Sequence, residues 1–284
     1  MRIVSLFPAG TEIVTALGAG GSLVGISHAC DHPRSVQHLP RVTTTPVDTS
    51  QSSAAVDAEV RRRQHAGEPV ILVDAEALRA LQPDLILTQE LCAVCAVEGD
   101  QLRELADALD PAPHLLSLSG GSLEGVEADI RRVAEALNLA EDGEEVVAGM
   151  RYRLRGLAPA RAAAPSRVVC VEWLEPLYLA GHWVPELVAA AGGEDVAGRV
   201  GEKSRRRAWA EVAAMRPDII LIMLCGVGLA RARDEWATFA RGNPGVVSLL
   251  GPARVRFVDG NAFTSRPGPR LVEGAQAIHA ALRS

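Results

Sequence analysis

Leu78-Arg79-Ala80-Leu81-Gln82-Pro83-Asp84-Leu85-Ile86-Leu87 recurs later in the chain, with nearly the same pattern, as Val212-Ala213-Ala214-Met215-Arg216-Pro217-Asp218-Ile219-Ile220-Leu221. Each copy has the end of a helical pattern, a Pro-Asp turn and an aliphatic run, which predicts a helix followed by a buried parallel strand. Upstream of each copy lies a second matched pair, residues 2–7 and 167–172, where an apolar strand precedes a loop and a helix. The chain is therefore predicted to contain two α/β lobes built on one plan.

The two lobes are expected to cover residues 1–120 and 164–284, with a helical linker over residues 121–163. In the linker, apolar residues recur at helical spacing from Leu123 to Leu137 and again from Glu141 to Leu157, so the connection is expected to be stiff. Ligands of open α/β sheets bind beyond the carboxyl ends of the strands. Two Rossmann-like lobes joined in this way predict a ligand groove between them.

Composition narrows the class of protein. The chain has 284 residues, a formal net charge of −6 and 48% hydrophobic residues, which is enough apolar content for two cores. This charge, and the lack of a long Lys/Arg block, argue against a nucleic-acid partner. The nearest basic run, Lys203 to Arg207, is interpreted as a solvated surface loop.

The cellular location is interpreted from the N-terminus and the cysteines. The chain opens with Met1-Arg2-Ile3-Val4-Ser5, already inside the first predicted strand, without the apolar region of a signal peptide. No apolar run reaches the ~18–20 residues that cross a bilayer. Five cysteines without the spacing of a disulfide framework fit a reducing compartment. As the sequence stands we expect a cytoplasmic protein, and a periplasmic one if the true start lies upstream.

The first lobe contains an insertion, residues 43–76, that the second lobe lacks. It opens with a Thr/Ser-rich loop, and a short amphipathic helix follows from Val56, with Ser53 as its expected N-cap. A short strand from Val70 to Val73 closes it. Two interpretations remain open, a lid on the groove side of the lobe and an inert surface insertion.

The cysteines gather near predicted strand ends. Cys92 and Cys95 form a Cys-x-x-Cys pair after the strand at residues 85–89, and Cys30 and Cys225 follow two other strands. Cys170 lies inside a strand and is expected in the core. One Cys-x-x-Cys pair is a moderate signal for metal or redox chemistry, because structural zinc normally needs more ligands. Passive packing of small apolar thiols is the alternative.

In the second lobe, aromatic, acidic and basic side chains also stand near predicted strand ends or helix starts. His182 and Trp183 stand just before the helix that starts near Pro185, and Glu172 with Trp173 ends a strand. Two interpretations of the two tryptophans remain open, contact with a ligand and packing within the lobe. In the loop over residues 261–270, Arg266 is expected over the groove or in solvent. No phosphate loop before a helix, Gly-x-Ser-x-Gly or His-Glu-x-x-His motif occurs, which favours a binding protein over an enzyme.

Several motifs together resemble a known family. They are the stretch from Ser5 to Glu12 (Ser-Leu-Phe-Pro-Ala-Gly-Thr-Glu), Leu23 to Ser27, Asp31-His32-Pro33, Ala180-Gly181 leading to the stretch from Leu187 to Asp195, and Arg266-Pro267-Gly268-Pro269-Arg270. The chain resembles the cobalamin- and siderophore-binding proteins of ABC importers, over nearly its whole length except the insertion. Its nearest likeness is to cobalamin-binding members, including a branch without a clear export signal.

The resemblance implies a fold of the class III periplasmic-binding-protein type, two lobes joined by a long helix with a corrinoid held between them. It places ligand contacts on Pro8 to Thr11, Ala29, Glu172, Phe263 and Arg266. It also places acidic docking residues for an ABC permease on Glu76 and, one position from the expected match, on Glu211. Together with the residues above, the expected ligand contacts are Phe7, Pro8, Ala9, Gly10, Thr11, Ala29, Cys30, Cys92, Cys95, Glu172, Trp173, His182, Trp183, Phe263 and Arg266.

Two functional hypotheses follow. In the first, the chain binds a corrinoid or a related metal chelate as the solute-binding component of an ABC-type uptake system, or as a cytosolic relative of one. In the second, it is a cytosolic metal-dependent enzyme or metal sensor that uses Cys92, Cys95 and His182. Thiolates with an imidazole suit Zn²⁺, Fe²⁺ or the cobalt of a corrinoid.

Overall fold

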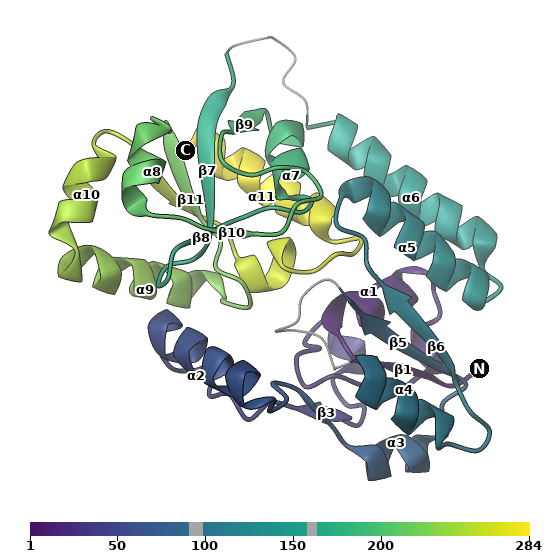
Figure 1. Ribbon diagram of the computed structural model, residues 1–284. Helices are drawn as coiled ribbons and strands as arrows, with labels where there is room; N and C mark the ends of the chain where they lie inside the picture. The colour runs from purple at the N-terminus through teal and green to yellow at the C-terminus, as the bar shows by residue number, and fades with distance from the viewer. Residues whose placement is uncertain (91–98, 158–163) are drawn as a thin grey trace. The chain divides into compact units, whose positions relative to one another are not determined.

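The computed structural model describes residues 1–90, 99–157 and 164–284. The described chain divides into two compact units, which are drawn in Figure 1. Unit 1 comprises Met1–Gln51, Ala58–Gly120 and Glu124–Ala148, and unit 2 comprises Ser52–Asp57, Gly121–Leu123 and Gly149–Ser284. The segment predicted as a linker is therefore shared between the two units.

Unit 1 is built on a four-stranded parallel sheet in the order β2-β1-β5-β6 (Figure 1). Its strands are β1 (Ile3–Ser5), β2 (Leu23–Ile26), β5 (Leu85–Gln89) and β6 (His114–Leu118). The helices that accompany them are α1 (Pro8–Ala16), α3 (Ala75–Leu81), α4 (Gly99–Asp107), α5 (Leu123–Ala136) and the first part of α6 (Ala140–Arg155), which continues into unit 2 from Gly149. Short 3-10 turns cover Gly20–Ser22 and Arg34–Val36. Aliphatic side chains of strands and helices form the core, among them Val4, Leu78, Ile86 and Leu102.

Unit 2 is built on a six-stranded mixed sheet in the order β10-β8-β7-β11-β12, with β9 paired to the first half of β7. Its strands are β7 (Ser166–Trp173), β8 (Tyr178–Leu179), β9 (Gly193–Asp195), β10 (Arg205–Arg206), β11 (Ile219–Ile222) and β12 (Arg254–Phe257). Strands β7, β9, β11 and β12 run parallel, whereas β8 is antiparallel to both β7 and β10.

Helices cover both faces of the unit 2 sheet (Figure 1). They are α7 (Val184–Ala190), α8 (Trp209–Ala214), α9 (Leu229–Gly242), α10 (Pro244–Leu250) and α11 (Leu271–Arg283), and a π-helical turn covers Gly260–Thr264. Helices α8, α9 and α10 pack on one face, where the rings of Trp209, Trp236 and Phe239 lie 5.3–6.0 Å apart. The α/β fold predicted from the sequence is confirmed in both units.

The sequence repeat is also a repeat of hydrogen bonds. In unit 1 the Asp84 carboxylate accepts from the backbone N–H of Arg2 at 2.6 Å, and in unit 2 Asp218 accepts from Arg167 at 2.8 Å. The residue before each proline has a left-handed backbone, with φ of 40° at Gln82 and 51° at Arg216. Each turn thus ends a helix and fastens the next strand beside the first strand of its unit. The Pro-Asp units predicted from the sequence are confirmed.

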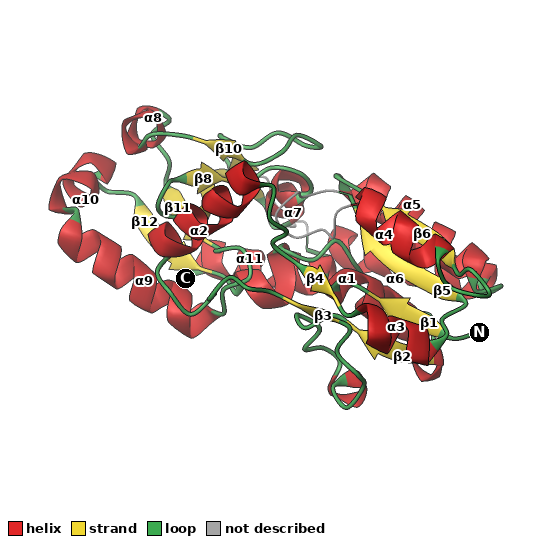
Figure 2. Cartoon of the chain, turned by 60° about the horizontal axis from the view of Figure 1, so that its bottom comes forward, coloured by secondary structure: helices red, strands yellow, loops and turns green. Residues whose placement is uncertain are grey.

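The insertion of unit 1 folds as a small excursion with its own secondary structure (Figure 2). Strand β3 (Thr43–Thr44) pairs antiparallel with β4 (Leu72–Val73), and α2 (Ser53–Ala66) lies between them in the sequence. The predicted N-cap was wrong by one residue. The Ser52 hydroxyl accepts from the N–H of Ala55 at 3.3 Å, while Ser53 is the first helical residue and is buried.

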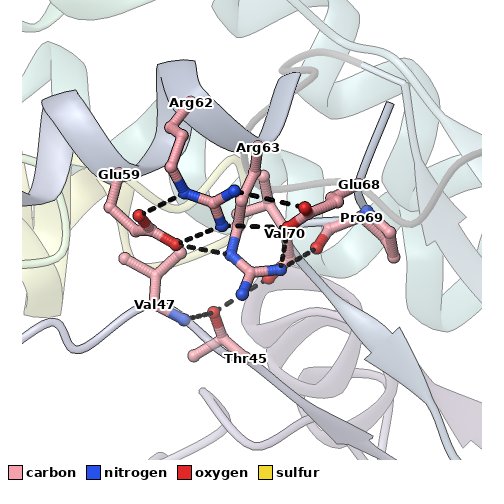
Figure 3. A network of polar contacts seen from close by, with 8 residues as sticks. All are labelled: Thr45, Val47, Glu59, Arg62, Arg63, Glu68, Pro69 and Val70. Atoms are coloured by element: carbon pink, nitrogen blue, oxygen red, sulfur yellow. Dashed lines mark hydrogen bonds and ion pairs between the residues drawn. The ribbon is translucent and has the colours of Figure 1, made fainter. Parts of the chain in front are cut away.

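A network of charges holds the second half of α2 against the chain that follows it (Figure 3). The Arg62 guanidinium lies 2.8 Å from Glu59 and 2.9 Å from Glu68, and Arg63 lies 2.9 Å from Glu59. Arg63 also donates to the carbonyl of Pro69 at 3.4 Å. The hydrogen bond from Arg62 is the main reason why the pKa of Glu59 is lowered to about 2. The helix therefore keeps its position mainly through polar contacts, since few of its side chains are buried.

Candidate ligand-binding site

In unit 1, the turn between β1 and α1 is packed into the protein. Phe7, Ala9, Gly10 and Thr11 are buried, and only Pro8 of this stretch is half-exposed. A Cβ atom at Gly10 would lie 2.9 Å from the Phe7 ring, so the residue must be glycine for the ring to pack there. Of the ligand contacts predicted on this turn, Pro8 is the side chain that reaches a surface of unit 1.

The loop after β2 is held by a set of hydrogen bonds. The Cys30 thiol is buried and lies 3.1 Å from the Thr11 hydroxyl. Arg41 donates to the carbonyl oxygens of Ser27, at 2.8 Å, and of Cys30. Ala29 is exposed at the tip of this loop. The loop therefore presents a small apolar side chain, and its cysteine points into the protein.

His28 in the same loop is fixed by Thr43, whose hydroxyl lies 2.7 Å from Nδ1 of the imidazole. Burial of the ring and the nearby charge of Arg41 lower the pKa of His28. Cys92 and Cys95 lie outside the described residues, so the thiol site predicted on them stays a prediction.

In unit 2, Glu172 and Trp173 form the carboxyl end of β7, and both are half-buried. Ser204 donates its hydroxyl to the Glu172 carboxylate. The indole N–H of Trp173 donates to the carbonyl of Ser53 at 3.1 Å. Ser53 in turn donates its hydroxyl to Glu235. The first turn of α2, which belongs to unit 2, thus sets the orientation of the Trp173 ring.

Neither Ser53 nor Glu235 was identified from the sequence as part of this region. Ser53 is 4% exposed, and the Glu235 carboxylate also accepts from Arg231 at 2.7 Å. Ser53 lies on α2, whereas Arg231 and Glu235 lie on α9, which is far from α2 in the sequence. The only local signal was the serine itself, and a serine before a helix indicates a cap more often than a tertiary contact.

The two residues before α7 have different surroundings. Trp183 is 6% exposed, and its indole N–H donates to the Thr264 carbonyl at 2.9 Å, so within unit 2 it is a packing residue. His182 is half-buried, has a left-handed backbone with φ of 52°, and its ring centre lies 5.5 Å from that of Trp183. Burial, and then the charge of Lys203, lower the pKa of His182, so its imidazole is neutral at pH 7.

His182 Nδ1 is buried and has no hydrogen-bond partner among the residues that the structure describes. Burying a polar atom without a partner costs free energy, which is unusual in a well-packed loop. Such an atom beside a strand end is a candidate for contact with a bound molecule. His182 therefore remains the strongest of the predicted contacts before α7.

The loop after β12 carries the last two predicted contacts. Phe263 is half-buried in the π-helical turn, and the guanidinium of Arg270 lies 5.2 Å from its ring centre. Arg266 is 4% exposed, and it donates to the side-chain oxygen of Asn261 at 3.0 Å. Arg266 is thus an internal residue of this loop rather than a solvated arginine.

Within the described ranges, no three His, Cys, Asp or Glu side chains are grouped closely enough to hold a metal ion. Cys170 is in the core, as predicted, where it is hydrogen-bonded to Asp195, and burial raises the pKa of its thiol well above the usual value. Cys225 follows β11 and is exposed. A metal site on Cys92, Cys95 and His182 would need the two cysteines that lie outside the described residues.

The two acidic residues predicted to dock a permease occupy similar places in the repeat, offset by one position. Glu76 lies in the first turn of α3 and Glu211 in the first turn of α8, the helices that precede the two Pro-Asp turns. Both side chains are exposed. Glu211 also accepts from the N–H of Ala208 at 2.7 Å, which caps α8.

Comparison with known proteins places this fold in a family. The family described as Periplasmic binding protein matches residues 3–246. The chain belongs to the periplasmic binding protein family. This family consists of binding proteins rather than enzymes, which confirms the interpretation made from the missing catalytic motifs. The two-lobed α/β fold of class III predicted for the chain is confirmed as well.

Curated relatives of the family cover most of the chain at low identity. A vitamin B12-binding protein of Pectobacterium carotovorum subsp. carotovorum is 23% identical over 98% of this chain and 86% of its own length. An uncharacterized ABC transporter substrate-binding lipoprotein of Bacillus subtilis is also 23% identical, over 98% of this chain and 78% of its own length.

Solved structures show the same fold. The periplasmic heme-binding protein HutB of Vibrio cholerae superposes with a TM-score of 0.73 at 18% identity, covering 100% of this chain and 99% of that one. The periplasmic vitamin B12-binding protein BtuF of Vibrio cholerae gives a TM-score of 0.63 at 18% identity, covering 99% and 96%. At this identity the likeness is one of fold.

In the part of the chain that the structure describes, no helix is both long and apolar enough to span a bilayer.

Proposed function

We propose that this member of the family binds a corrinoid or a related tetrapyrrole metal chelate, as the solute-binding component of an ABC-type uptake system. The similarity to vitamin B12-binding proteins over 98% of the chain supports this class of ligand. The structural observation that carries it is Trp173, a half-buried indole at the last position of β7. A flat macrocycle needs a flat apolar surface, and the carboxyl end of a parallel strand is where such folds bind ligands.

The side chains around Trp173 suit a ligand that is both apolar and polar. Glu172 supplies an acceptor at the carboxyl end of β7, and His182 supplies a neutral imidazole in the loop after β8. Both residues are held by backbone or side-chain hydrogen bonds. Ligand sites of this kind combine an apolar wall with a few polar groups in fixed positions. In unit 1 the loops after β1 and β2 present Pro8 and Ala29, whose side chains are small.

The test is a titration of the purified full chain with cyanocobalamin, dicyanocobinamide and hemin, followed by absorbance and by tryptophan fluorescence. Binding of at least one of them with a Kd below ~10 µM, worth about −7 kcal/mol, is the expected result. If none binds at ~100 µM, where even about −5.5 kcal/mol would be detected, tetrapyrrole chelates are excluded.

Glu76 and Glu211 are proposed to contact basic residues of the permease. Their similar places, in the first turns of α3 and α8, support the pairing, with Glu211 one position from the exact match. Exchanging both for glutamine should abolish ligand uptake in cells and leave the ligand Kd in solution unchanged. Glutamine at position 211 still accepts from the N–H of Ala208, so the cap of α8 is kept. Unchanged uptake would remove these two residues from the docking surface.

A further inference from the structure

Helix α6 is shared between the two units. Unit 1 includes its residues up to Ala148, and unit 2 includes those from Gly149 onward. At this point the described chain leaves unit 1 and does not return, whereas Ser52–Asp57 and Gly121–Leu123 of unit 2 are each followed by residues of unit 1. The stiffness of α6 at Gly149 therefore governs any motion of one unit against the other.

The first half of α6 is held by α5 of unit 1. Arg131 of α5 donates two hydrogen bonds to the Glu144 carboxylate, at 2.6 and 3.0 Å. The two helices also approach closely at Gly143, where an added Cβ atom would lie 2.6 Å from the Cβ atom of Ala134. Val147, one turn further along α6, is 1% exposed. This half of the helix is thus fixed to unit 1.

The second half of α6 is held by α11 of unit 2. Arg153 donates to the Glu273 carboxylate at 3.0 Å and to the side-chain oxygen of Gln276 at 3.3 Å. Met150, at the start of this half, is 4% exposed. The two halves of one helix are therefore fixed to different units.

Gly149 lies between these two sets of contacts, and packing does not explain why it is a glycine. It is exposed, and among the described residues an added Cβ atom would meet nothing within 4 Å beyond its own helix backbone and chain neighbours. Its backbone is helical and not left-handed. Alanine would fit at this position, unlike at Gly143, and would favour the helix, because glycine has the most mobile backbone of all residues. Gly149 is thus a weak point of α6 that no contact requires.

Two short segments limit how far α6 can bend. Residues 52–57 and 121–123 belong to unit 2, although the chain on both sides of each belongs to unit 1. A carboxylate of unit 2 holds each segment. Glu235 accepts from the hydroxyl of Ser53, and Glu186 accepts from the N–H of Leu123 at 2.8 Å. Through the continuous chain, these two contacts restrain unit 1 as well.

We infer that α6 bends at Gly149, so that the two units move against each other about this residue, and that the contacts of Glu235 and Glu186 restrain the motion. Hinges between rigid parts consist of a few residues that absorb a change in backbone angles, and they are often small residues. The units are not joined by a flexible linker, since α6 is helical on both sides of the hinge. The inference goes beyond the proposed function, because it needs no ligand.

The test uses the full chain without ligand and compares two glycine variants. The test variant is Gly149→Ala. The matched control is Gly242→Ala, because Gly242 is also helical, exposed and free of close contacts, but it ends α9 within unit 2. The first measurement is hydrogen exchange of the α6 amides. The second is the width of the distance distribution between nitroxide labels at Arg103 of α4 and Ala280 of α11, measured by pulsed electron paramagnetic resonance. Both label sites are exposed, and coupling the labels to a keto amino acid leaves the native cysteines in place.

The Gly149→Ala variant should slow the exchange of amides 150–153, whose helical bonds span position 149, by about fivefold, which reflects the preference of a helix for alanine. It should also narrow the distance distribution, whereas Gly242→Ala should change neither quantity. Glu235→Ala should broaden the distribution, because one restraint on the motion is lost.

The label distances separate a hinge from a glycine that only weakens α6 locally. Slower exchange in Gly149→Ala with an unchanged width of the distribution overturns the hinge, and so does a change of equal size in the Gly242→Ala control. An unchanged width in Glu235→Ala shows that the Ser53 contact is not a restraint. None of these results bears on the proposed function, which the ligand titration decides.

Discussion

Trp183→Phe should lower the stability of unit 2 and leave ligand binding intact. Trp183 is 6% exposed, and its indole N–H donates to the Thr264 carbonyl at 2.9 Å. Phenylalanine keeps a ring in the same place and removes this donor. A buried carbonyl left without its donor costs about 1–3 kcal/mol, and the smaller ring adds on the order of 1 kcal/mol for the space it leaves.

The expected total is about 3 kcal/mol in the free energy of unfolding. For a domain of about 150–250 residues, this corresponds to a fall in Tm of roughly 6–12 °C. The measurements are urea unfolding followed by circular dichroism, and a thermal scan at the same pH. The ligand Kd should change less than twofold, because the ring is covered by its own unit.

Trp173→Leu provides the contrasting variant. Trp173 is half-buried at the end of β7, and its indole N–H donates to Ser53 at 3.1 Å. We expect a stability loss of about 0.5–1.5 kcal/mol for this less buried hydrogen bond and at least a tenfold rise in the ligand Kd, about 1.4 kcal/mol. The assignment would be refuted by the opposite pattern, a Trp183→Phe protein that melts like wild type and has lost its affinity.

Two further predictions concern polar contacts of unit 2. Glu235→Ala should raise the amide exchange rate of residues 52–57 by about tenfold or more, since a hydrogen bond to a charged group is worth about 1.5–3 kcal/mol. The control variant Asp234→Ala, at an exposed neighbouring residue, should not change this rate. Equal rates in the two variants would show that the Ser53 contact does not hold this segment. Burial and the charge of Lys203 lower the pKa of His182 in the folded protein. As the pH falls below about 6.5, the unfolded protein therefore takes up a proton at His182 before the folded protein does, and the folded state loses stability. Asparagine tolerates the left-handed backbone of this position. The His182→Asn variant should therefore lose less stability than the wild type between pH 7.5 and 5.5, measured by urea unfolding. An identical loss in the two proteins would contradict this prediction.

The strands and helices of the repeat could be predicted closely because their signals are local. The strand predicted at residues 85–89 is β5 (Leu85–Gln89), and the linking helix predicted from Glu141 to Leu157 is α6 (Ala140–Arg155). A run of aliphatic residues between turn residues specifies a buried strand whatever surrounds it. The Pro-Asp turns were predicted from their own residues, whereas the hydrogen bond of each carboxylate to a backbone N–H of the adjacent strand was found only in the structure.

The sequence-based predictions differed from the structure where a polar side chain can make more than one kind of contact. Ser53 was predicted to cap a helix, and the structure uses Ser52 for that contact and directs Ser53 to Glu235. The basic run from Lys203 to Arg207 was interpreted as a solvated surface loop; Arg205 and Arg206 are exposed, but they form an edge strand rather than a loop. A hydroxyl or a guanidinium is equally compatible with solvent, with a cap and with a distant partner, so composition could not choose among them.

The sequence by itself determined that this protein has two α/β units, where the strand after each Pro-Asp turn lies, and that it lacks the motifs of an enzyme. It could do so because apolar periodicity and turn residues act over a few positions along the chain. Only the tertiary structure decided that Trp183 packs within its unit while Trp173 is oriented by Ser53. These relations join residues far apart in the chain, and they depend on strand register and burial, which no local pattern encodes.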